Sequence, residues 1–72
     1  MPRFNPGDRV RLVGEVMDPE KREMVPVPGA GEVATVNQFV TQLPSGELYD
    51  IKVDGGFCDN LGVNGNNLEP AD

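Results

Sequence analysis

Few side chains in this sequence have the chemistry for catalysis or metal binding, and most of those are carboxylates. Histidine, the usual acid–base group near neutral pH, is absent from the 72 residues. Asp50, Asp54 and Asp59 lie on both sides of the Gly55-Gly56 pair, where a tight turn would bring oxygen ligands for Ca²⁺ together. Because the spacing does not match an EF-hand loop, a solvated strand face explains these acids better. We therefore predict no metal site and no cofactor.

The one cysteine, Cys58, is the only thiol nucleophile that the sequence offers. No lysine or histidine stands beside it to activate the thiol, which favours a buried or interface position over catalysis. A lone cysteine cannot form an intramolecular disulfide, and this is typical of a reducing compartment. No apolar run resembles a signal peptide or reaches the about 20 residues of a membrane span. We expect a cytoplasmic protein with no membrane contact.

The charge of the chain argues against one class of partner. The net charge is −6, and Lys52 is the one cation among residues 23–72. Binding to a phosphate backbone depends on clustered lysine and arginine side chains, and an acidic domain repels such a backbone. We therefore predict no nucleic-acid partner.

The elements that position these side chains have the patterns of short β-strands in one domain, residues 1–72. Alternation is clearest where Val10 and Leu12 oppose Arg9 and Arg11, and again at Tyr49, Ile51 and Val53. Turn residues separate the runs. The predicted strands are residues 8–12, 32–39, 46–53, 57–63 and 66–69. The predicted core is Val10, Val33, Tyr49, Ile51, Val53 and Leu68.

Two irregular features stand out between these strands. Val33 and Val36 are three residues apart and cannot share a face of a regular strand, which predicts a bulge or a strong bend. Residues 13–30 contain three prolines and no helical period, which predicts a long loop with an extended segment at 24–28. Within that loop, residues 18–23 are expected to form one helical turn that begins at Asp18. Loops of this length in compact domains are often functional.

Four segments of the chain carry a resemblance to a known family: residues 4–11, 31–33, 48–53 and 67–71. They are similar to the SH3-like barrels grouped as electron-transport accessory proteins. That group includes the C-terminal domain of the nitrile hydratase β-subunit, the variable chain of ferredoxin-thioredoxin reductase and a small photosystem I subunit on the ferredoxin side. The resemblance implies an all-β fold, a small five-stranded antiparallel SH3-like barrel with a long first loop, and no active-site residue.

A second resemblance supports an enzymatic alternative. The Gly7–Arg11 segment, Gly-Asp-Arg-Val-Arg, also opens the type II dihydrofolate reductases, which are single SH3-like barrels with an active site in a tetramer pore. Their pore-lining Val-Gln-Ile-Tyr segment is replaced here by Asp-Asn-Leu-Gly-Val-Asn at residues 59–64. Our leading prediction is therefore a non-enzymatic accessory or interaction module. The alternative is a small oligomeric enzyme with its active site at a subunit interface.

The predicted partner is a protein, and the predicted contact surface combines residues 13–30 with two aromatic side chains. The candidate contact residues are Arg22, Met24, Phe39 and Phe57. A homodimer is also expected, since the short last strand leaves an unpaired edge and Phe39, Val40 and Leu43 form an apolar run beyond the second strand.

Overall fold

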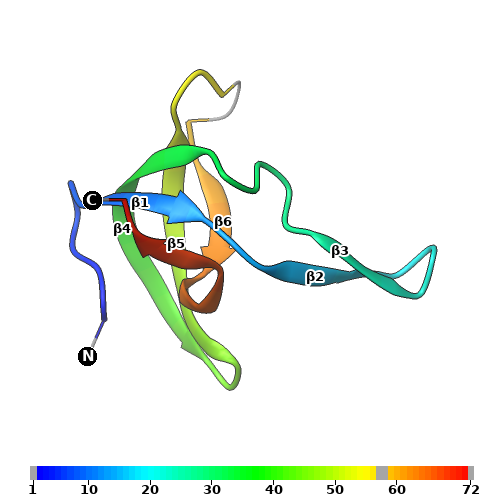
Figure 1. The fold of residues 1–72 in the computed structure, drawn as a ribbon. Coiled ribbons are helices and arrows are strands. Elements are labelled where there is room, and N and C mark those ends of the chain that lie inside the picture. The colour runs from blue at the N-terminus through cyan, green and yellow to red at the C-terminus, as the bar shows by residue number, and fades with distance from the viewer. Residues whose placement is uncertain (1, 57–58, 72) are drawn as a thin grey trace.

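The fold is all-β and consists of two antiparallel sheets (Figure 1). A computed structural model describes residues 2–56 and 59–71 of the chain. The larger sheet has five strands in the order β6-β5-β4-β1-β7, and the smaller one is the β2-β3 hairpin. The strands are β1 (Arg9–Leu12), β2 (Glu15–Asp18), β3 (Glu23–Pro26), β4 (Val33–Leu43), β5 (Gly46–Val53), β6 (Leu61–Asn64) and β7 (Leu68–Pro70), with the 3₁₀ turn η1 (Gly65–Asn67) before β7. The predicted count of five strands therefore fits the larger sheet alone.

The chain path requires the larger sheet to curl. In a flat five-stranded sheet the two edge strands would lie roughly 19 Å apart, at about 4.8 Å per neighbouring pair. Here β6 and β7 occupy opposite edges, yet only η1 joins them. Four residue steps span at most about 14 Å even when fully extended, and about 8 Å in a 3₁₀ conformation. The sheet must bend around its own concave face, and Figure 1 shows the strands arranged in this way.

Alternation in β1 and β5 is confirmed. Val10 and Leu12 are fully buried, whereas Arg9 and Arg11 lie on the outer face. In β5, Tyr49 and Ile51 are fully buried and Val53 is half-buried against the same core. Each strand therefore presents one apolar face to the interior, as a period of two residues requires.

The bulge predicted between Val33 and Val36 is wrong in position. Pairing with β1 is regular there, with Val10 opposite Ala34, and cross-strand partners share a face of the sheet. Because Val10 points inward, Ala34 and Val36 also point inward and are buried, while Val33 is only half-buried. The register shifts instead between Val36 and Gln38 and again between Phe39 and Thr41. These two bulges bend the long strand β4.

The predicted long loop is largely a β-hairpin. Residues 15–18 and 23–26 pair in regular register, and the turn between them closes with a 2.7 Å hydrogen bond from Arg22 N–H to the Asp18 carbonyl. The Asp18 carboxylate also accepts the N–H groups of Glu20 and Lys21, at 2.9 and 3.3 Å. The helical turn expected over residues 18–23 is instead the turn of this hairpin, since Asp18 ends β2 and Glu23 begins β3. Pro26 is tolerated because β3 is an edge strand.

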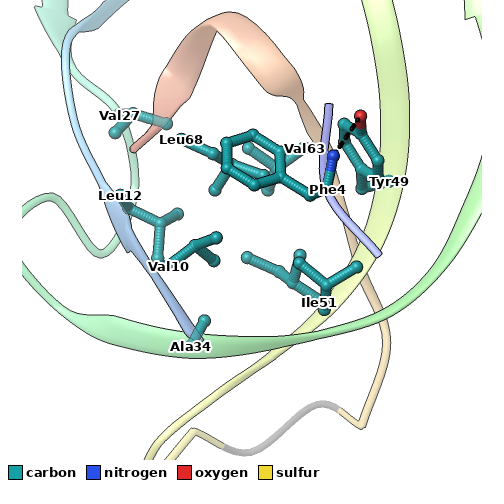
Figure 2. Packing of buried hydrophobic residues seen from close by; sticks show 10 residues of the cluster. Phe4, Val10, Leu12, Val27, Ala34, Tyr49, Ile51, Val63 and Leu68 are labelled. Carbon is teal, nitrogen blue, oxygen red and sulfur yellow. Dashed lines mark hydrogen bonds between the residues drawn. The ribbon is translucent and has the colours of Figure 1, made fainter. Parts of the chain in front are cut away.

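The hydrophobic core fills the concave side of the larger sheet (Figure 2). Val10, Tyr49, Ile51 and Leu68 are buried as predicted. Val33 is not part of the core. Val53 is half-buried and packs against the core. The remaining buried apolar residues come from the N-terminal segment, the hairpin root and three strands: Phe4, Leu12, Val27, Ala34, Val36 and Val63.

The last two strands are shorter than predicted or shifted. The fourth strand was expected from residue 57 but begins at Leu61, and residues 57 and 58 lie outside the described residues. The closing strand starts at Leu68 rather than Asn66, since residues 65–67 form η1. Asn64 caps this turn by accepting the Asn66 N–H at 2.9 Å. A short asparagine-rich stretch favours such a side-chain-capped turn over a strand.

Candidate protein-interaction surface

The hairpin exposes a pair of methionines. Met17 and Met24 are direct cross-strand partners, and their side chains are 58% and 52% exposed. On the opposite face, Val16 pairs with Val25 and packs against the core. The ribbon is therefore apolar on both faces, but only the valine face, near its root, is covered.

The root of the hairpin is fixed while the rest projects away from the larger sheet (Figure 1). Val27 is buried in the core, and its N–H donates to the Gly14 carbonyl at 3.0 Å. Val13 and Asn67 exchange hydrogen bonds: the Val13 N–H donates to the Asn67 carbonyl at 2.9 Å, and the Asn67 side-chain amide donates to the Val13 carbonyl at 3.0 Å. These contacts hold the base of the ribbon and leave its outer part exposed.

Arg22 ends the turn at the tip of the hairpin. Its φ is 56°, a left-handed conformation that is uncommon for a residue with a side chain. It is exposed, and it stands next to Lys21 in a ribbon that also carries Glu15, Asp18, Glu20 and Glu23. The tip is cationic within an acidic ribbon.

Phe39 lies on a different part of the protein. It is 36% exposed on the second half of β4, and its ring meets the buried Tyr49 ring edge-on, with centroids 5.9 Å apart. Its neighbour Val40 is 44% exposed, and Leu43 is half-buried. One register shift precedes Phe39 and the second falls at Val40, between Phe39 and Thr41, which accounts for consecutive apolar residues reaching the surface.

The predicted contact residues do not form one surface. Arg22 and Met24 lie on the hairpin, which projects to the right in Figure 1, whereas the second half of β4 runs to the bottom of the view. Phe57 lies outside the described residues. Met17 was missed, although the Val-Met-Asp order of residues 16–18 is mirrored as Glu-Met-Val in residues 23–25. That mirrored order is a sequence signal for a hairpin that pairs the two methionines.

A polar cluster centred on Tyr49 fastens the N-terminal segment to the sheet. The Tyr49 hydroxyl accepts the N–H groups of Arg3 and Phe4, at 2.8 and 3.2 Å, and donates to Glu47 Oε1 at 3.2 Å. Figure 2 shows the Phe4 bond beside the core. The Phe4 ring packs edge-on against Tyr49, with centroids 5.5 Å apart. One buried hydroxyl thus satisfies three polar partners.

Arg3 completes the cluster with an ion pair. Its Nε donates to Glu47 Oε1 at 2.8 Å, and its Nη2 donates to Asn66 Oδ1 at 3.0 Å. The hydrogen bond from Arg3 is the main cause that lowers the pKa of Glu47 to about 2. Gly65 permits this packing, because a Cβ there would lie 2.8 Å from Arg3 Nη2 and 2.9 Å from a Tyr49 ring carbon. Every group of the cluster has a structural partner.

The three carboxylates around the Gly55-Gly56 turn do not converge on one point. Asp54 pairs with Arg9, Asp50 accepts a hydrogen bond from Gln38, and Asp59 lies 3.8 Å from the Lys52 ammonium. The hydrogen bond from Arg9 is the main cause that lowers the pKa of Asp54. Within residues 2–56 and 59–71, no three metal-ligating side chains gather into a cluster.

Two of the hollows formed by the described residues are candidate binding sites. One, of about 230 Å³, lies between the hairpin root and β6, and is lined by Val16, Val27, Pro28, Leu61, Gly62, Val63, Asn64 and Asn67. The other, of about 260 Å³, is lined by Arg3, Phe4, Asp8, Arg9 and Pro70. In the second, both arginines are already paired with carboxylates, Glu47 and Asp54. The first is mostly apolar and is the better binding candidate.

Comparisons with protein-family models, with curated proteins and with solved structures found no match to this chain. None of the helical segments in the described residues has the length and apolar character needed to cross a membrane. Three surface features can support a function: the hairpin, the apolar patch of Phe39 and Val40, and the apolar hollow.

Proposed function

We propose that this chain is an SH3-like barrel that acts as a non-enzymatic protein-interaction module and contacts its partner through the methionine face of the hairpin. The single observation that carries the proposal is the cross-strand pair Met17 and Met24, each more than half exposed on a projecting ribbon. Exposed apolar side chains that gather in one place are typical of interaction sites.

The strand arrangement supports the barrel. Strand β1 pairs with both β4 and β7, and β4, β5 and β6 form an antiparallel meander. The curl that η1 imposes brings the two sheet edges toward each other. The hairpin takes the place of the wide first loop that many SH3-like barrels carry.

Methionine suits a contact surface of this kind. Its unbranched, polarizable side chain adapts to irregular partner surfaces. Met17 and Met24 are already about half buried, so covering each one contributes roughly 1 kcal/mol, about half of the value for a fully exposed side chain. A two-stranded hairpin is only marginally stable alone, so a partner that covers the methionine face would also order the ribbon.

Affinity capture from the native source tests the proposal. The bait is the full chain, compared with the double variant Met17→Ser and Met24→Ser and with a control, Glu69→Ser, which changes an exposed residue on β7 away from both apolar surfaces. We expect the wild type and Glu69→Ser to retain the same partner protein, identified by mass spectrometry, and the double variant to lose it. Undiminished capture by the double variant would contradict the assignment. Turnover of dihydrofolate with NADPH would overturn the non-enzymatic role.

We also propose a homodimer through the Phe39 and Val40 patch, which is exposed on β4. Sedimentation equilibrium at micromolar concentration should give roughly twice the chain mass. Val40→Lys should shift the protein to monomer, because it places a charge in the apolar contact. A wild-type protein that stays monomeric at high salt and high concentration rules the dimer out.

A further inference from the structure

The apolar hollow beside β6 is too small for most ligands and is open to a side chain. Its volume of about 230 Å³ falls below the roughly 300 to 1,000 Å³ of typical small-molecule sites. Its walls are mainly the aliphatic side chains of Val16, Val27, Leu61 and Val63. A single apolar side chain from another chain fits this size and chemistry.

The same hollow borders an unpaired strand edge. Strand β6 stands at the end of the sheet order, and in the part of the chain that the structure describes no strand pairs with its outer side. Proteins usually protect such edges with charges or proline, and residues 61–64, Leu-Gly-Val-Asn, contain neither. An extended peptide pairing with β6 would place alternate side chains at the hollow, since all four β6 residues line it.

The charges around this edge select the occupant. Asp50 lies directly opposite Gly62 in the β5-β6 pairing, and Asp59 lies two residues before the start of β6. The Lys52 ammonium lies 3.8 Å from the Asp59 carboxylate. With a net charge of −6 on the chain, an acidic peptide would be repelled from this edge and a basic peptide attracted.

We propose that the outer edge of β6 binds an extended basic segment of a partner protein. One apolar side chain of that segment fills the hollow, and its lysine or arginine residues face the acids around the edge. The inference rests on the proposed role as an interaction module, and it concerns a surface other than the methionine face.

A titration of the full ¹⁵N-labelled chain tests the inference. The probe is a capped peptide of alternating lysine and valine. We expect saturable amide shifts at residues 61–64 and at Val16, weakened by salt because the attraction is electrostatic. A peptide with glutamate for lysine should cause no shift, and replacing the central valine with alanine should weaken binding about tenfold. Shifts that map elsewhere, no shifts, or binding insensitive to either peptide change would overturn the proposal.

Variants at Gly62 separate charge from shape. A Cβ at this position would meet only Leu48 Cδ1, at 3.7 Å, which is an ordinary contact. Gly62→Lys should abolish binding of the lysine peptide, and Gly62→Glu should retain it. Equal loss or equal retention in the two variants overturns the charge-selected edge. Partner capture through the methionine face is a separate readout, so failure here leaves it standing, and failure there leaves this titration valid.

Discussion

The larger sheet and the hairpin are built from similar alternating sequences, yet they differ in what covers their apolar residues. Tyr49 and Ile51 on β5 are fully buried, whereas Met17 and Met24 on the hairpin are more than half exposed. The sheet curls, so its concave face encloses its own side chains. A two-stranded hairpin is too narrow to enclose its own side chains, so those on its outer part stay exposed to solvent. Both regions carry apolar side chains, and the curvature of the larger sheet decides which of them are buried in the core and which stay on the candidate contact surface.

The sharpest way to break this comparison is to truncate a core residue of the sheet. Ile51→Ala should lower the free energy of unfolding by about 2 to 5 kcal/mol, since it leaves a cavity in a small core. That is a large part of the stability of a domain this size. Chemical denaturation measures it. An unchanged transition midpoint would show that β5 does not form the centre of the fold.

Tyr49→Phe should have the next largest effect. It keeps the buried ring but removes the hydroxyl that accepts the N–H groups of Arg3 and Phe4 and donates to Glu47. Leaving such groups without a partner costs about 1 to 3 kcal/mol. The matched control is Phe39→Leu, which changes an aromatic residue with no hydroxyl in the same neighbourhood. Equal loss in both variants would mean that the ring contacts, not the hydroxyl, hold the N-terminal segment.

Particular residues show what the sequence could predict. The inward set of β1 and β5 follows from alternation alone, because those strands are regular. Val33 was predicted as core, but the pairing of Val10 with Ala34 makes Ala34 the inward residue. The hairpin was not predicted because Pro26 and Pro28 disfavour a central strand. An edge strand tolerates proline.

The candidate site was less predictable than the fold. Met24 and Arg22 were identified from a segment predicted as loop, but Met17 is recognised only once the two strands are in register. The hollow joins Val16 and Val27 with residues 61–64 and Asn67, which are distant in sequence and meet only because the sheet curls. No local sequence pattern indicates that these residues lie together. To predict the hollow, one must know that η1 connects the two edge strands of the larger sheet and so makes the sheet curl.

Acid provides a milder test of the sheet. The folded-state pKa of Glu47 is lowered to about 2 from the usual 4.5, so its ion pair with Arg3 contributes stability that is fully present above pH 4.5. That contribution is lost as the pH falls from 4.5 toward 2. The pKa of Asp54 is also lowered, mainly by its hydrogen bond from Arg9. Denaturation midpoints across this range should fall less steeply in Glu47→Gln than in the wild type. An unchanged slope in Glu47→Gln would show that the pair with Arg3 does not form.

The smallest effect on stability is expected in the hairpin, and it is the most informative for function. Met17→Ser with Met24→Ser should change the free energy of unfolding by no more than about 0.5 kcal/mol, because exposed side chains lose little when they are shortened. The same double variant should lose the partner captured by the wild type. Both measurements are needed, because a large loss of stability would mean that the methionines support the fold and that lost capture reflects unfolding. Stability unchanged and capture lost would place folding in the curled sheet and recognition in the uncovered ribbon.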